Sequence, residues 1–164
     1  MVDFYKDTME NKLILFVEVS ITVMAFSSII FQVRSTNDPG FNGFAFMGIM
    51  VHGFLALISS CLTLVLMELL ENHTALFRYA GLFLGIITIL QVLMVFKNDQ
   101  QSPLPMKIIL LILASAVFSF QVLNLSTYIN YSGAYFLMAI LYHIFMSLLL
   151  FMIMIMQVVE KERK

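Results

Sequence analysis

The stretch Leu13–Val33, LILFVEVSITVMAFSSIIFQV, decides the fold of this chain. Its residues are almost all apolar, and the run is as long as the ~20 residues that an α-helix needs to cross the hydrocarbon core of a bilayer. One carboxylate, Glu18, interrupts it. A lone acid inside such a run is costly and marks either a polar pairing or a functional site. We therefore expect a spanning helix here, with Glu18 as its most informative residue.

The composition of the whole chain supports the same class. Of the 164 residues, 61% are hydrophobic and only 12% are charged, whereas soluble domains carry about 25% charged residues. The sequence therefore predicts an integral membrane protein, with residues 1–164 forming a single transmembrane helical domain in contact with the lipid bilayer. The formal net charge of −1 provides no basic face, which argues against nucleic acid as a partner.

Four further apolar runs follow the first, separated by short polar segments. Asp38-Pro39-Gly40 is a typical turn, and Pro103 and Pro105 block helix continuation. The polar residues before Leu13 are expected to be a short amphipathic lead-in. The fold class is thus all-α, a polytopic transmembrane helix bundle of five spans at about 13–33, 43–67, 75–96, 108–125 and 134–159. The fourth span is the shortest, with Gln121 and Asn124 near its end, so four spans are the alternative.

Basic residues predict the orientation of the spans. One side collects Lys6, Lys12 and Arg78, whereas the other collects Arg34, Lys97, Lys107, Lys161, Arg163 and Lys164. Lys and Arg favour cytoplasmic loops, so we expect the C-terminus in the cytoplasm and the N-terminus outside. Five of the six tyrosines fall at the outer ends, where the amphipathic ring suits the headgroup region: Tyr5, Tyr79, Tyr128, Tyr131 and Tyr135.

Helical spacing aligns small and polar residues on one face of three spans. The first span carries Glu18, Thr22, Ala25, Ile29 and Gln32, and the second carries Gly48, His52, Ala56, Ser59 and Thr63. In the third, Gly81 and Gly85 form a GxxxG pattern continued by Thr88, which permits close backbone approach. The simplest interpretation of each stripe is helix packing through small residues and hydroxyls.

Glu18, His52 and His143 are ionisable residues that lie inside the predicted spans, away from the span ends. With the first two spans antiparallel, Glu18 is expected opposite Ser59, Ser60 and Thr63, whose hydroxyls are hydrogen-bond partners for the acid. With the fifth span parallel to the first, His143 lies about 13 Å and Glu18 about 8 Å below the outer end, so the two are expected to meet. His52 enters from the inner side and is a less obvious partner. The structural alternative is a protonated carboxyl that only fixes helix register.

Signatures of catalysis are missing from the sequence. It contains no H-E-x-x-H, no G-x-S-x-G and no Cys pair. Two histidines and one glutamate on three helices are a low-specificity set for a metal, and haem ligation by His52 and His143 is disfavoured by their differing depths. We therefore expect neither enzymatic activity nor a cofactor or metal.

Both ends of the chain resemble one known group. The stretch VEVSITVMAFSSI at 17–29, with Leu123-Asn124 and Gly133-Ala134-Tyr135-Phe136-Leu137 near the end, is similar to small uncharacterised bacterial multi-pass inner-membrane proteins. The group typically has Ala-Gly before the Phe, where this chain has Met24-Ala25. The resemblance implies a bacterial inner-membrane location and a position of interest at Glu18, and it brings no assigned activity.

Two functions follow as expectations. In the first, the bundle self-associates and forms or gates a polar pathway for ions or protons, with Glu18 and His143 as its central pair. In the second, the protein is an accessory or scaffold subunit that binds another membrane protein through its small-residue faces.

Overall fold

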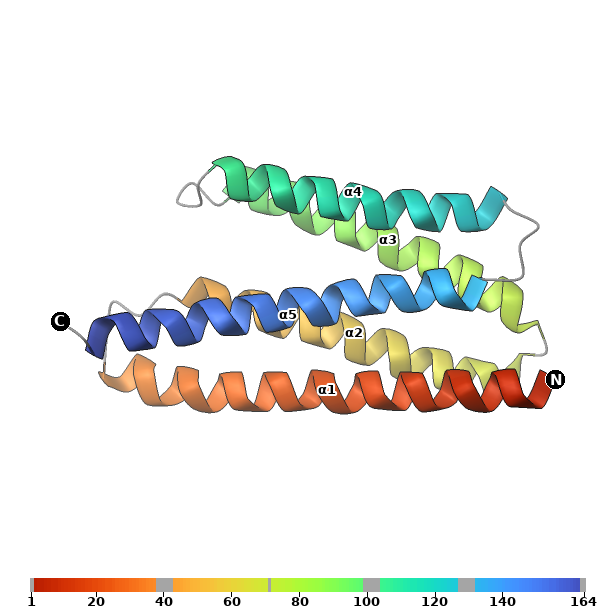
Figure 1. The fold of residues 1–164 in the computed structure, drawn as a ribbon, viewed down its shortest axis with the longest axis horizontal. Helices are drawn as coiled ribbons and strands as arrows, with labels where there is room; N and C mark the ends of the chain where they lie inside the picture. Colours follow the sequence, from red (N-terminus) through yellow and green to blue (C-terminus); the bar gives the residue numbers. More distant parts are fainter. Residues whose placement is uncertain (1, 38–42, 71, 99–103, 127–131, 163–164) are drawn as a thin grey trace. The chain divides into compact units, whose positions relative to one another are not determined.

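The computed structural model describes residues 2–37, 43–70, 72–98, 104–126 and 132–162. Within these ranges the chain forms five α-helices and no strands: α1 (Val2–Asn37), α2 (Gly43–Leu69), α3 (His73–Asn98), α4 (Leu104–Ser126) and α5 (Ser132–Glu162) (Figure 1). Each helix contains a segment long and apolar enough to cross a membrane: Asp7–Arg34, Ala45–Leu69, His73–Met94, Lys107–Leu125 and Ser132–Met156. The predicted all-α, multi-pass membrane fold is therefore confirmed for the described part of the chain.

The helices are longer than the apolar runs that predicted them. The polar lead-in continues into the first span as a single helix of 36 residues, and α5 extends as far as Glu162. Hydropathy marks only the part of a helix that suits lipid, whereas backbone hydrogen bonding continues through polar residues. The turn predicted at Asp38-Pro39-Gly40 and the residue Pro103 lie outside the described residues.

The shortest predicted span is a helix of 23 residues, α4. At a rise of 1.5 Å per residue this is about 34 Å, enough to cross a bilayer. Pro105 lies in its first turn, where the missing N–H would have no intrahelical acceptor. Gln121 and Asn124 are buried in protein, as their polarity suggested.

The chain divides into two compact units whose boundary lies within helices. The first, here called the α1–α2–α5 unit, contains Met1–Leu64 and Ile140–Lys164. The second, the α3–α4 unit, contains Val65–Ala139 and so includes the end of α2 and the start of α5. Both α2 and α5 therefore continue from one unit into the other.

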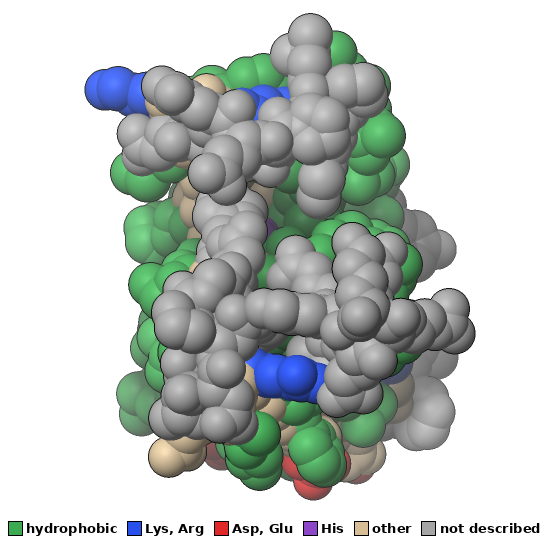
Figure 2. All heavy atoms as spheres, turned by 90° about the vertical axis from the view of Figure 1, so that its left-hand side faces the viewer, with side chains coloured by type: hydrophobic (Ala, Val, Ile, Leu, Met, Phe, Trp, Pro, Cys, Tyr) green, Lys and Arg blue, Asp and Glu red, His purple; other side chains and the backbone are tan. Residues whose placement is uncertain are grey.

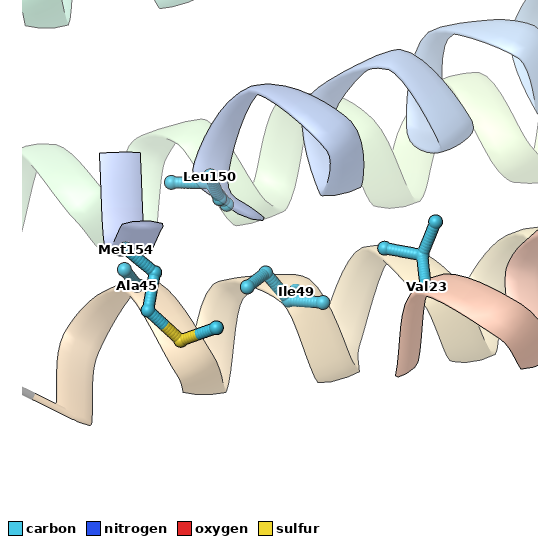
Figure 3. Close-up of a cluster of buried hydrophobic side chains, with 5 residues drawn as sticks. All are labelled: Val23, Ala45, Ile49, Leu150 and Met154. Atoms are coloured by element: carbon cyan, nitrogen blue, oxygen red, sulfur yellow. The ribbon is translucent and has the colours of Figure 1, made fainter. Parts of the chain in front are cut away.

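In the α1–α2–α5 unit, α2 runs antiparallel to α1 and α5 (Figure 1). All three helices contribute to its buried apolar cluster, which is formed by Val23 on α1, Ala45 and Ile49 on α2, and Leu150 and Met154 on α5 (Figure 3). Because lipid tails are as apolar as these side chains, close packing rather than exclusion from water favours such contacts.

Two glycines of α2 allow the neighbouring helices to approach its backbone. A Cβ atom added to Gly53 would lie 2.6 Å from Cγ of Met24 on α1. One added to Gly48 would lie 2.6 Å from Cδ1 of Leu150 on α5. These separations are shorter than carbon atoms tolerate, so larger residues at either position would move a neighbouring side chain. Helix α2 thus meets both partners at places without side chains.

In the α3–α4 unit, α3 and α4 pack as an antiparallel pair (Figure 1). Gly81 and Gly85 are buried where α3 meets α4, and both face Gln121. A Cβ atom on Gly81 would overlap the Gln121 Oε1 atom, and one on Gly85 would lie 3.2 Å from the Gln121 Cγ atom. Near the same level, the rings of Phe77 and Phe136 stack with centroids 5.8 Å apart. The GxxxG face of α3 therefore accommodates the amide of α4.

Large apolar side chains cover the outside of every helix. The exposed ones include Phe26, Phe54, Phe83, Ile112 and Phe145, one from each helix in turn. Figure 2, seen from the end of the ribbon at which α5 finishes, shows hydrophobic side chains on the flanks and Lys and Arg side chains at this end. Water-exposed patches of this extent are rare on soluble monomers, whereas a bilayer accommodates them. The chain therefore has the surface of an integral membrane protein.

Candidate functional site

The most distinctive polar contact lies inside the α1–α2–α5 unit and joins two histidines. The Nδ1 atom of His52 on α2 lies 2.9 Å from the Nδ1 atom of His143 on α5. The ring centroids are 5.2 Å apart, and the rings are tilted by 37°. His143 has no exposed surface. Both residues lie within segments able to cross the membrane, so the contact forms in a region where ionisable groups are rare and usually functional.

The antiparallel register of α2 and α5 brings the two rings together. One turn along α5 from His143, the hydroxyl of Ser147 donates a hydrogen bond to the backbone carbonyl of Ile49, at 3.3 Å. Residues four apart lie on the same face of a helix, so Ser147 and His143 approach α2 from one side. Gly48 then receives Leu150 without a Cβ in the way. Small or polar residues on both helices thus hold the rings at hydrogen-bonding distance.

The short contact between two Nδ1 atoms limits the protonation of the pair. An imidazole nitrogen donates a hydrogen bond when it carries a proton and accepts one when it does not. One ring must therefore present Nδ1–H while the other presents the Nδ1 lone pair. At most one of the two rings is cationic while the contact lasts, because a cationic imidazole carries protons on both nitrogens.

Tyr142 contacts both histidines with its ring edge. Its centroid lies 5.3 Å from that of His143 and 6.2 Å from that of His52, with interplanar angles of 76° and 79°. Edge-to-face packing is favourable for aromatic rings and restricts their rotation. Tyr142 therefore restrains both imidazoles although its sequence position, beside one of them, gave no sign of this role.

The predicted pairing of Glu18 with His143 is wrong in this structure. The stripe formed by Glu18, Thr22, Ala25, Ile29 and Gln32 does share one face of α1, but all five residues are exposed. The buried face of α1 carries Val23, Met24 and Ser27 instead. His143 meets His52, which the sequence had made the less obvious partner.

The level of Glu18 along the bundle agrees with the expectation, and the rotation of α1 does not. Phe31 of α1 stacks on Phe46 of α2 with centroids 4.1 Å apart, and Met24 faces Gly53. This antiparallel register brings Glu18 to the level of Ser59, as predicted. The helix is turned about its axis, however, so that the carboxylate points outwards.

The other predicted site residues have separate surroundings. The Thr22 hydroxyl donates to the Glu18 carbonyl of its own helix at 2.7 Å, which leaves it on the exposed face. Ser59 is half-buried and Thr63 is buried. Ser60, which was also expected to bond to Glu18, is completely buried, and its hydroxyl has no hydrogen-bond partner in the described part of the chain. The inward face of α2 thus carries buried hydroxyls as well as His52.

Within the described part of the chain, the surroundings of the pair match a metal or haem site poorly. No group of three or more His, Cys, Asp or Glu side chains suited to a metal is found in the described ranges. Cys61 is exposed. The imidazoles contact each other directly, so no porphyrin fits between them as it does between two axial ligands. The expected difference in depth between His52 and His143 was wrong, because the two rings are in contact. The depths were counted from the expected span ends, whereas the helix α5 extends beyond its predicted span to a length of 31 residues.

A second group of buried polar side chains lies in the α3–α4 unit. The Nε2 atom of Gln121 donates to the carbonyl of Tyr135 at 2.6 Å, and the Nδ2 atom of Asn124 donates to that of Ser132 at 3.4 Å. These amides connect the end of α4 to the start of α5. Amides have no titratable proton in the physiological range, so this group has a fixed charge.

The fold and the buried pair define the class as a multi-pass integral membrane protein with ionisable groups inside its spans. Comparison with protein-family models, curated proteins and solved structures gives no match. The functional assignment therefore depends on the residues of this chain.

Proposed function

We propose that this protein is a non-enzymatic membrane protein whose α1–α2–α5 unit forms or gates a polar pathway for ions or protons. The observation that carries this proposal is the contact between His52 and His143 inside membrane-spanning segments. Ionisable residues are expensive in a bilayer, and they are retained in transport pathways and proton relays. A contact that only held two helices together would be made at lower cost by apolar residues or glycine.

Other polar groups lie on the same two helices. One turn along α5 from His143, Ser147 bonds to the carbonyl of Ile49. On α2, in the other direction from His52, the buried hydroxyls of Ser60 and Thr63 lie eight and eleven residues away, or about 12 and 16 Å at 1.5 Å per residue. The hydroxyl of Ser60, which is buried without a hydrogen-bond partner among the described residues, is placed to bind water. These groups supply polar positions along α2 on either side of His52.

Loop charges supply an orientation for this pathway. With five crossings, the side containing Arg34, Lys97 and Lys107 is cytoplasmic by the positive-inside rule. The N-terminus then lies outside and the C-terminus inside, and the resemblance of the terminal helices favours a bacterial inner membrane. Reporter fusions at both ends test this topology. Two termini on one side would mean that one helix, most simply α4, does not cross.

The outward face of α1 favours a second candidate function. Glu18 and Thr22 are exposed there among large apolar side chains such as Ile21 and Phe26. A carboxylate facing lipid is unfavourable, and a partner helix offering a hydrogen-bond donor would relieve that cost. The protein would then be an accessory or scaffold subunit that binds a second copy or another membrane protein through α1.

Flux and association measurements on purified protein distinguish the two functions. In liposomes, the pathway hypothesis predicts flux of protons or small cations that depends on His52 and His143. The scaffold hypothesis predicts no flux, together with an oligomer or complex that dissociates when Glu18 and Thr22 are replaced by leucine and valine. Flux that is the same in liposomes with and without the protein would contradict the pathway hypothesis.

A further inference from the structure

We infer that the species handled at the His52–His143 pair is the proton, which crosses through the Nδ1–Nδ1 hydrogen bond while metal and hydrated cations are excluded. This inference rests on the proposed pathway and specifies what passes along it. It depends on the separation of the two nitrogens, on their burial and on the aromatic contacts of both rings.

The separation of the nitrogens leaves room for a proton and for nothing larger. The Nδ1 atoms are 2.9 Å apart, which is the usual length of a hydrogen bond between polar atoms. A metal ion bonded to both nitrogens at about 2.0 Å each would need them about 4 Å apart when it lies between them. A hydrated alkali cation needs still more space. At the tetrahedral angle a metal ion would still need the nitrogens about 3.3 Å apart, so any such ion would have to move the two rings, whereas a proton moves along the bond that already exists.

The transfer conserves protons within the pair. The starting state has one ring with a proton on Nδ1 and the other with a proton on Nε2. A proton first binds to the unprotonated Nε2 of the first ring. The Nδ1 proton of that ring then crosses to the unprotonated Nδ1 of the second ring. Finally, the second ring releases its Nε2 proton. One proton enters, one leaves, and no bond other than N–H is formed or broken. The pair ends with its donor and acceptor exchanged.

This exchange makes the transfer slow and dependent on ring motion. A second proton can follow in the same direction only after the rings have recovered their first tautomers, which requires an imidazole to turn or to exchange protons with its surroundings. Tyr142 lies edge-on to both rings, at centroid distances of 5.3 and 6.2 Å, and therefore opposes that turning. We assign Tyr142 as a positioning residue that sets the rate of recovery.

Few other ionisable groups surround the pair within its own unit. Among the α1 side chains that the structure describes, the buried polar ones are Ser20 and Ser27, whose hydroxyls donate to carbonyls of their own helix. Glu18 faces outwards. Among the described residues of α2 and α5 in this unit, the histidine and tyrosine side chains buried or half-buried at the site are His52, Tyr142 and His143. The proton carried by the pair is thus its main variable charge.

The experiment measures proton and potassium flux separately in liposomes that contain the full chain. A pH-sensitive dye inside the vesicles reports proton entry, with valinomycin and potassium setting the membrane potential, and a potassium-sensitive dye reports potassium in vesicles without valinomycin. Wild type is expected to pass protons slowly, more slowly in D2O, and to pass no potassium. His52→Gln and His143→Gln, which cannot relay a proton, are expected to fall to the rate of protein-free vesicles. Tyr142→Leu is expected to pass protons faster than wild type.

Two further variants control for folding. His73→Gln removes a histidine outside the pair, whose Nε2 atom contacts the carbonyl of Met67, and should conduct like wild type. The double variant His52→Leu/His143→Leu keeps an apolar contact, so its lack of flux cannot be attributed to an unpaired buried ring. No flux of any cation in wild type would overturn the proposed pathway itself. Potassium flux, or proton flux that persists in both glutamine variants, would overturn the proton inference and leave a pathway elsewhere.

Discussion

The two units of this protein both bury polar side chains between helices, and they do so with different chemistry. The α1–α2–α5 unit joins two imidazoles, His52 and His143, which gain and lose protons near neutral pH in water. The α3–α4 unit uses Gln121 and Asn124, whose amides donate to backbone carbonyls and keep one charge state. Both arrangements hold hydrogen-bonded polar groups away from water, but only the first can change its charge.

This difference separates a contact that fixes the fold from one that is suited to a function. Gln121 occupies the space over Gly81 and bonds to Tyr135, so its amide is locked between α3 and the start of α5. His52 and His143 contact each other through the hydrogen bond between their Nδ1 atoms. Substitutions at three places test this division, beginning with the one expected to have the largest effect.

Gly81→Leu should destabilise the protein most. The new side chain would overlap the Gln121 amide and approach the Phe136 backbone, and overpacking of this kind costs about 3 kcal/mol at its upper range. Reversible unfolding in mixed micelles measures the loss. Phe83→Leu, at an exposed position on the same helix, is the matched control and should change little. Equal stability of the two variants would mean that α3 does not meet α4 at Gly81.

Replacing one histidine should cost more than replacing both. His52→Leu leaves the completely buried His143 ring without its Nδ1 partner, and an unsatisfied buried polar group costs about 2 kcal/mol. His52→Leu/His143→Leu removes both polar groups and should recover most of that loss. The same unfolding measurement on His52→Leu, His143→Leu and the double variant completes a double-mutant cycle. Additive effects would show that the rings do not interact.

Glu18→Gln should have the smallest effect. The side chain is exposed on α1 and away from the histidine pair, so stability should stay within about 0.5 kcal/mol of wild type and proton flux should be unchanged. Glu18→Leu should be as stable or more stable in lipid, because it removes a polar group from an apolar face. If Glu18→Gln instead abolishes flux, the outward face of α1 belongs to the pathway. If only Glu18→Leu dissociates an oligomer, the face binds a partner.

The sequence predicted the spans well because hydropathy and length are properties of each segment alone. The five apolar runs correspond to α1 through α5, and the differences lie at helix ends, where polar residues continue the helix. The glycines at positions 81 and 85 also came from a local pattern, and they lie at a helix contact. The hydropathy of a segment and the spacing of its glycines can be read without knowing which helix packs against it.

The histidine pair could not be predicted in the same way. Periodicity placed Glu18, Thr22 and Ala25 on one face, but in a membrane both faces of a helix are apolar, so hydrophobicity does not say which one turns inwards. The meeting of His52 with His143 depends on the stagger of α5 along α2, which is set by Gly48, Ser147 and Leu150. Aligning α2 with α5 through these three residues would have brought the two histidines to the same level. Counting the depth of each histidine from the expected end of its span did not.

The hydrogen bond of Ser147 gives the histidine contact a neighbour that responds to the same motion. Ser147 and His143 lie one turn apart on one face of α5, and they contact Ile49 and His52 of α2. A slide of α5 along α2 that parts the imidazoles must therefore also lengthen the bond from Ser147 to the Ile49 carbonyl. Sliding is resisted at two adjacent turns, which leaves rotation of a ring as the easier motion at the pair.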